Sequence, residues 1–84
     1  MNPYLPRGVR LRHDTIRGRW VLLAPERIFE VDDVGVEILK RCDGRSLVDM
    51  LQDLAAAFSV QPEDIRGDVE TFLKDFAQKR VVEL

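Results

Sequence analysis

Residues 19–33 read RWVLLAPERIFEVDD, and this stretch decides the fold. Its first half, Trp20–Leu23, is a short run of aromatic and branched side chains, which predicts a strand. Pro25–Glu26 predicts a tight reversal, because proline fixes its own φ and cannot donate to a ladder. Arg27–Val31 then predicts a second strand, and at Asp32 the spacing of apolar residues changes to that of a helix. The stretch therefore predicts an antiparallel hairpin that leads into a helix.

A further strand is predicted before this hairpin. Residues 9–14 read VRLRHD, in which apolar and charged side chains alternate. This period of two is typical of a half-buried strand. His13 takes an inward position in the alternation, so we expect its imidazole to be structural. Together the three predicted strands form an antiparallel meander.

Three helices are predicted after the strands. The first begins at Asp32 as N-cap and ends near Asp43, where Gly44 can take the left-handed C-cap conformation. The second follows Ser46 as N-cap. Its apolar stripe recurs at the helical period and consists of Leu47, Leu51, Leu54 and Phe58.

The third helix is predicted to begin at Pro62, a residue favoured at the first helical position. Gly67 lies inside this predicted helix. It either lets another backbone come close or only lowers the stability of the helix to a degree that the fold tolerates. The apolar stripe of this helix consists of Ile65, Val69, Phe72, Leu73 and Phe76. The predicted fold class is α+β and winged helix-turn-helix-like, with a three-stranded antiparallel sheet followed by three helices. We expect residues 1–84 to form a single domain, with a terminal strand stub over residues 81–84.

Composition limits the chemistry that the chain can perform. The chain has 84 residues, of which 45% are hydrophobic and 33% charged, which is typical of one small folded domain of thin stability. Cys42 is the single cysteine and His13 the single histidine, so neither a Cys-x-x-Cys site nor a histidine cluster exists. We therefore predict no enzymatic activity, no catalytic residue, no bound metal and no cofactor.

The longest apolar runs are Leu54–Phe58 and Val21–Ala24, which are far shorter than a membrane span. The amino end has no apolar stretch of the kind that a secretory signal needs. Together with the lone cysteine, this predicts a cytoplasmic protein without a membrane partner.

The second and third predicted helices have the length and turn position of a helix-turn-helix. This pattern keeps a winged-helix DNA-binding regulator open as an alternative function. The third helix argues against it, because Glu63–Arg80 holds five acidic and four basic residues, whereas a recognition helix should be basic. Nucleic acid is therefore the less favoured partner.

The sheet edge provides another function, because an unpaired strand presents free backbone groups to a second chain. The third strand, Arg27–Val31, has three large apolar side chains and few charged residues that would discourage pairing with another strand. Beside the third helix it would make a groove for an extended peptide. The alternative role of these apolar side chains is only to fill the core, and both roles stay open. A second copy can use the same edge, so a homodimer through the strand edge and a monomer both stay open.

Several local strings occur in an order that is specific to one family. They are Leu22-Leu23-Ala24-Pro25-Glu26, Ile38-Leu39 followed by Cys42-Asp43-Gly44, and Asp68-Val69 followed by Phe72-Leu73. In these strings the chain resembles the PqqD family of pyrroloquinoline quinone biosynthesis, over nearly its whole length. The resemblance implies the fold of a RiPP precursor recognition element, a winged helix-turn-helix variant. It further implies a non-catalytic peptide chaperone that binds the precursor peptide PqqA and presents it to the radical SAM enzyme PqqE.

The resemblance also implies the binding residues, because related elements pair the peptide with the third strand and lay it against the third helix. The backbone partners would then be Arg27, Ile28, Phe29, Glu30 and Val31, and the apolar wall Val69, Phe72, Leu73 and Phe76. The chain departs from many relatives just after the third helix, where they have a glycine and this chain has Lys79-Arg80. The structure at the end of that helix is therefore left open.

Overall fold

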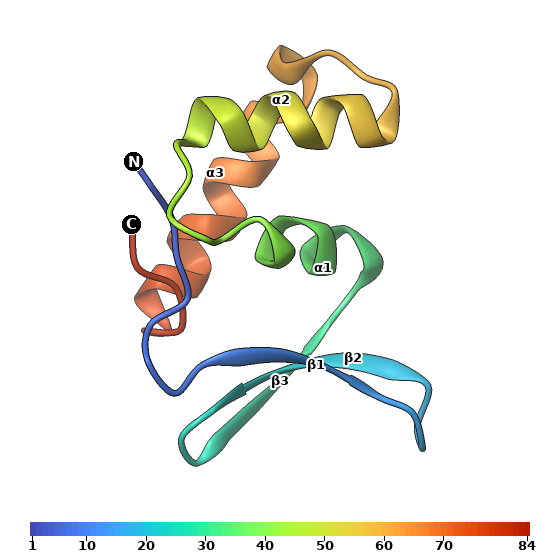
Figure 1. The fold of residues 1–84 in the computed structure, drawn as a ribbon, viewed down its shortest axis with the longest axis vertical. Helices are drawn as coiled ribbons and strands as arrows, with labels where there is room; N and C mark the ends of the chain where they lie inside the picture. The colour runs from blue at the N-terminus through green and yellow to red at the C-terminus, as the bar shows by residue number, and fades with distance from the viewer.

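The computed structural model describes residues 1–84 and contains three strands followed by three helices. This order confirms the predicted α+β, winged helix-turn-helix-like fold class. The elements are β1 (Arg10–Asp14), β2 (Arg19–Ala24), β3 (Arg27–Val31), α1 (Asp33–Lys40), α2 (Leu47–Phe58) and α3 (Pro62–Gln78). The helices all lie on one side of the sheet, so its other face has no layer above it (Figure 1).

The sheet is an antiparallel meander in the order β1-β2-β3, as the sequence predicted. Ala24 pairs with Arg27, so only two residues connect β2 to β3. Glu26 has a φ of 64° after Pro25, which is the pattern of a type II turn. This turn fixes the register of the hairpin, with Leu22 opposite Phe29.

Side-chain caps begin the first two helices. The Asp32 carboxylate accepts a hydrogen bond from the Gly35 backbone nitrogen at 2.7 Å, and the Ser46 hydroxyl accepts one from Asp49 at 3.1 Å. Both N-caps were predicted from the sequence.

The predicted end of the first helix was wrong, because α1 stops at Lys40 and not near Asp43. The backbone nitrogens of Arg41 and Cys42 donate to carbonyls three residues back, so the last turn tightens and the chain leaves the helix. Gly44 does take a positive φ, 92°, but it lies in the loop that follows.

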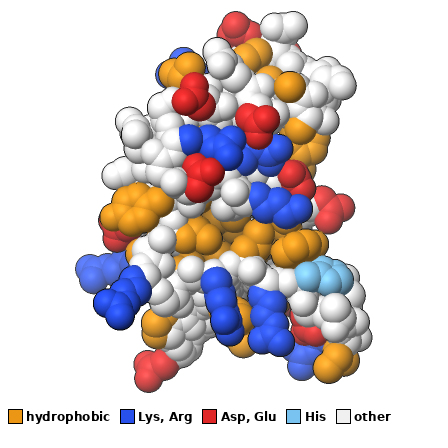
Figure 2. Space-filling view, in the orientation of Figure 1, with side chains coloured by type: hydrophobic (Ala, Val, Ile, Leu, Met, Phe, Trp, Pro, Cys, Tyr) orange, Lys and Arg blue, Asp and Glu red, His pale blue; other side chains and the backbone are white.

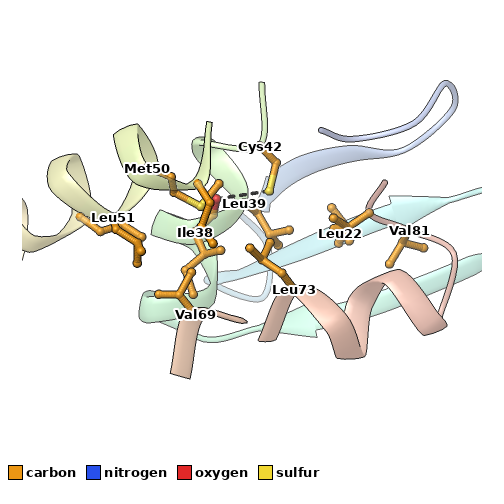
Figure 3. Packing of buried hydrophobic residues seen from close by; sticks show 12 residues of the cluster. Leu22, Ile38, Leu39, Cys42, Met50, Leu51, Val69, Leu73 and Val81 are labelled. Carbon is orange, nitrogen blue, oxygen red and sulfur yellow. Dashed lines mark hydrogen bonds between the residues drawn. The ribbon is translucent and has the colours of Figure 1, made fainter. Parts of the chain in front are cut away.

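The core lies between the sheet and the helices, and side chains from β2, the helices and the C-terminal tail converge in it (Figure 3). Leu22, Met50 and Leu73 have no exposed surface. Met50 lies outside the predicted stripe of α2, whereas Phe58, which was in that stripe, is 43% exposed. No helix has both the length and the apolar character needed to cross a bilayer.

His13 is exposed and does not point into the core, in contrast to the prediction. Its ring packs against Trp20, with ring centroids 5.0 Å apart. The alternation was correct for the strand, but the helical layer does not extend over this end of β1.

The two ends of the chain meet beside the core. Tyr4 and Glu83 exchange two backbone hydrogen bonds of 2.9 Å, and Tyr4 also bridges to Asp43. Val81 and Val82 of the tail are buried. The predicted terminal stub is therefore a single-residue bridge. It brings the two ends of the chain close together (Figure 1).

Helix α3 ends in a Schellman motif. The Val81 backbone nitrogen donates to Phe76 at 3.1 Å, and the Arg80 nitrogen donates to Ala77 at 2.9 Å. This places Arg80 at the left-handed position with a φ of 63°. A side chain at such a φ is strained, because its Cβ approaches the following carbonyl.

We expect Arg80→Gly to raise the free energy of unfolding by about 0.5–1 kcal/mol, because the strain is relieved at a modest entropic cost. The melting temperature should rise by roughly 2–8 °C in a thermal melt. Lys79→Gly is the matched control, because Lys79 has a helical φ of −76° and gains nothing from glycine. An Arg80→Gly variant that melts below the wild type would refute the strain at this position.

Candidate peptide-binding site

Strand β3 is an edge of the sheet, because its only partner is β2. In an antiparallel pair, alternate residues bond to the neighbouring strand. The two-residue turn makes Arg27, Phe29 and Val31 the bonded partners of β2. The backbone groups of Ile28 and Glu30 therefore point away from the sheet. We call these outward groups the strand edge.

The side chains of β3 divide between the two faces of the sheet. Phe29 and Val31 face the helices and are half-buried. Ile28 faces the opposite side and is 70% exposed, and Glu30 forms an ion pair with Arg19. Of the three apolar side chains of β3, two therefore pack against the core and one stays exposed.

An aromatic cluster joins β3 to α3. The rings of Phe29 and Phe76 are 6.2 Å apart, and Phe72 stacks on Phe76 at 4.3 Å. All three rings are half-buried, so each keeps some surface toward solvent. We call Phe29, Phe72 and Phe76 the aromatic wall. It is a surface beside the strand edge and not a deep groove, because no cavity of the molecule is lined by residues of both β3 and α3.

The other two residues predicted for the wall lie in the core. Val69 is 4% exposed and Leu73 has no exposed surface. They contact the buried cluster that includes Leu22 and Ile38, so they can support the aromatic wall from behind.

Gly35 allows α1 to lie close to the aromatic wall. A Cβ on Gly35 would be 2.6 Å from a methyl group of Val31 and 3.0 Å from the Phe72 ring. It would also be 3.1 Å from the Asp32 carboxylate that caps α1. The sequence pattern did not indicate this close approach, because it depends on residues far apart in the chain.

Gly67 differs, because a Cβ there would meet nothing within 4 Å. No other part of this chain therefore needs the glycine.

A network of ion pairs holds α1 and α2 together on the face shown in Figure 2, where side chains of both signs lie next to one another. Arg41 binds Glu37 at 2.9 Å and Asp53 at 2.5 Å, and Arg45 binds Asp43 at 2.9 Å and Asp53 at 3.3 Å. The spacing of residues along the chain did not reveal this network, because Asp53 of α2 binds arginines that lie outside that helix.

The arginines in this network lower the pKa of the carboxyl groups that they bind. Hydrogen bonds from Arg45 lower the pKa of Asp43 to about 2, and hydrogen bonds from Arg41 lower the pKa of Glu37 and of Asp53. A lowered pKa favours the folded state above the ordinary pKa of the group, and this contribution is lost as the pH falls through the lowered value.

Cys42 is buried, and its thiol donates to the Ile38 carbonyl at 3.5 Å (Figure 3). Burial, together with the charge of Asp43, raises the pKa of the thiol to about 12. The thiol is therefore protonated at neutral pH and is a poor nucleophile. The chain also contains no group of three His, Cys, Asp or Glu side chains placed to hold a metal ion.

The raised pKa of Cys42 predicts a loss of stability in alkali. An unfolded thiol ionises above its ordinary pKa of 9.0, whereas the folded thiol stays neutral up to about 12. Between these values the free energy of unfolding should fall by up to about 1.4 kcal/mol per pH unit from this group. Urea unfolding at several pH values, with Cys42→Ala as control, isolates the contribution. The stability difference between the two proteins should shrink as the pH rises, and a constant difference would contradict the prediction.

The helix-turn-helix pair α2 and α3 carries a net negative charge. Helix α2 contains Asp49 and Asp53 but no Lys or Arg. In α3, Arg66 is paired with Glu70 at 3.0 Å, and Lys79 just beyond it is paired with Asp75 at 2.8 Å. A surface of this charge does not favour a phosphate backbone.

The relatives of the chain identify the family. Residues 19–82 match the sequence model of the family described as Coenzyme PQQ synthesis protein D (PqqD). The chain belongs to the PqqD family. It is 46% identical over 83 residues to the PqqA binding protein of Xanthomonas oryzae pv. oryzae, and the match covers 98% of this chain and 90% of that protein. It is 49% identical over 82 residues to the bifunctional coenzyme PQQ synthesis protein C/D of Methylorubrum extorquens, where it covers 96% of this chain but spans only 22% of that longer protein.

Two solved PqqD structures share this fold. The solution NMR structure of the PqqD truncation of Methylobacterium extorquens PqqCD has a TM-score of 0.82 and 48% identity, and the match covers 99% of this chain and 89% of that one. It is described as a functional and stand-alone RiPP recognition element. The crystal structure of PqqD from Xanthomonas campestris has a TM-score of 0.64 and 44% identity, covering 100% and 94% of the two chains. The winged fold predicted from the sequence is thus the fold of the PqqD family.

Proposed function

We propose that this protein is a peptide chaperone of pyrroloquinoline quinone biosynthesis that binds the precursor peptide PqqA through its single domain, residues 1–84. The observation that carries the proposal is the unpaired strand edge of β3 beside the aromatic wall. Such an edge offers backbone hydrogen bonds to an extended peptide, and the neighbouring rings offer apolar contacts to alternate side chains. The PqqA-binding relatives of nearly equal length support the identity of the peptide.

The proposed binding mode uses the residues of β3 in two ways. Ile28 and Glu30 exchange backbone hydrogen bonds with the peptide, while Arg27, Phe29 and Val31 hold the edge in place by pairing with β2. Phe72 and Phe76 receive the peptide side chains that point toward the helices, and Val69 and Leu73 support these rings.

In this proposal the chemistry on the peptide belongs to a partner, the radical SAM enzyme PqqE, which cross-links a Glu and a Tyr side chain of PqqA. The chaperone presents the peptide and performs no reaction itself. The protonated thiol of Cys42 and the exposed stacking of His13 on Trp20 support a non-catalytic role, because neither side chain has the partner that a nucleophile or base requires.

Calorimetric titrations with PqqA and, separately, with duplex DNA test the proposed function against the winged-helix alternative. We expect saturable binding of PqqA at a ratio of one peptide per chain, and no comparable heat with DNA. Binding of DNA without binding of PqqA would overturn the proposal in favour of a DNA-binding regulator.

The strand edge also offers a pairing surface to a second copy of the chain. We propose that any homodimer formed through β3 competes with the peptide, because both need the same backbone groups. Sedimentation velocity across a range of concentrations should then show fewer dimers when PqqA is added. A dimer fraction that does not change when PqqA is added would contradict this competition.

A further inference from the structure

An apolar cavity opens where the aromatic wall ends. Its volume is about 170 Å³, and it lies among α1, α2 and α3. The buried side chains of Ile38, Leu54 and Val69 line it. Val34 and Phe58, which also line it, are 56% and 43% exposed, so the cavity is open to solvent on their side. We call it the anchor cavity.

The anchor cavity is continuous with the aromatic wall and close to the end of β3. Phe72 belongs to both the wall and the cavity lining. Asp32, which directly follows β3, also lines the cavity. The Val31 end of β3 is therefore the end of the strand next to the cavity.

The size of the cavity suits a single side chain. Sites for small molecules usually enclose about 300–1,000 Å³, which is well above the 170 Å³ found here. Seven of the ten lining residues are hydrophobic, so the occupant that gains most from entering is a large apolar side chain.

The charge beside the cavity is negative. Asp32 and Asp68 line it, whereas no Lys or Arg does. Neither carboxylate takes part in an ion pair, although Asp32 also caps α1. Two unpaired carboxylates next to an apolar cavity favour a ligand that brings a positive charge close to its apolar part.

We propose that the anchor cavity binds one large apolar side chain of the captured peptide, and that Asp32 and Asp68 select a peptide with a Lys or Arg within two positions of that side chain. In an extended peptide, residues one or two positions away lie close enough for a long basic side chain to reach these carboxylates. This inference rests on the proposed function, since it concerns how the PqqA peptide is chosen.

Two tryptophan variants test the cavity by calorimetric titration with PqqA. Val34→Trp blocks the mouth, and Val48→Trp is the matched control, because Val48 is 57% exposed and lies on α2 outside the cavity. We expect Val34→Trp to weaken binding at least about tenfold, the effect of excluding one buried apolar side chain, and Val48→Trp to bind like the wild type. Equal affinity of the two variants would overturn the inference and leave the proposed function intact.

A charge exchange tests the selection of a basic residue. Each Lys or Arg of PqqA is replaced in turn by Glu, and each peptide is titrated into the wild type and into Asp68→Lys. We expect one Glu-substituted peptide to bind the wild-type protein up to about fivefold more weakly than unmodified PqqA does. The same peptide should bind Asp68→Lys more tightly than it binds the wild type. If no Glu-substituted peptide binds Asp68→Lys more tightly than it binds the wild type, selection by charge is refuted. If the wild type does not bind PqqA at all, the proposed function fails and the inference fails with it.

Discussion

Glu30→Pro should weaken PqqA binding at least about tenfold while the sheet stays folded. The Glu30 backbone nitrogen points outward, so proline removes a donor that only a bound peptide would use, and its ring also obstructs the approaching strand. Calorimetric titration measures the affinity, and circular dichroism checks the fold. Phe29 would be a poor choice for the same test, because its backbone pairs with β2 and proline there would damage the sheet itself.

Glu30→Ala is the matched control for this prediction. It also removes the ion pair with Arg19, but it keeps the backbone donor. We therefore expect Glu30→Ala to bind PqqA nearly as well as the wild type. If folded Glu30→Pro binds as tightly as Glu30→Ala, the peptide does not pair with this strand.

Gly35→Ala should lower the free energy of unfolding by about 1–3 kcal/mol, although alanine favours a helix more than glycine does. The added methyl group would meet Val31 at 2.6 Å and Phe72 at 3.0 Å, so these side chains must move apart. Because Phe72 is part of the aromatic wall, PqqA binding should weaken as well. Urea unfolding measures the first effect and calorimetric titration the second.

Gly67→Ala is the matched control, since this position lies inside α3 and an added Cβ would meet nothing within 4 Å. Here only the higher helix propensity of alanine acts. We expect the free energy of unfolding to rise by about 0.5–1 kcal/mol and the affinity for PqqA to stay unchanged. A Gly35→Ala protein at least as stable as the wild type would show that α1 does not need its close approach to the wall.

The sequence predicted the features that short stretches of chain determine. Pro25 set the turn of the hairpin, and Asp32 and Ser46 capped the helices at the predicted positions, because each acts on neighbours within four residues. The five-residue span of β3 was predicted without error for the same reason.

Features that depend on packing between distant elements were harder to predict. The end of α1 was placed three residues too late, because Arg41 and Cys42 bond three residues back. His13 was placed inside because the alternation cannot say how far the helices extend over the sheet. Arg80 takes a left-handed conformation that its residue type disfavours, because the buried tail requires the chain to turn there.

The candidate site was predicted only in outline. The sequence placed β3 and α3 together, but it could not distinguish the partly exposed rings of Phe72 and Phe76 from the buried Val69 and Leu73, which share their stripe. The anchor cavity could not be predicted from the sequence either, because its lining comes from three helices whose relative placement the sequence does not reveal.

Amide hydrogen exchange with and without PqqA tests directly whether the peptide pairs with β3, because it reports on individual backbone donors. The outward amides of Ile28 and Glu30 have no partner in the sheet, so they should exchange fast in the free protein and slow markedly when the peptide binds. Leu11 and His13 provide an internal control, because their amides point outward from β1, the opposite edge. We expect protection on β3 with no change on β1, and protection confined to β1 or to α2 would contradict peptide pairing at β3.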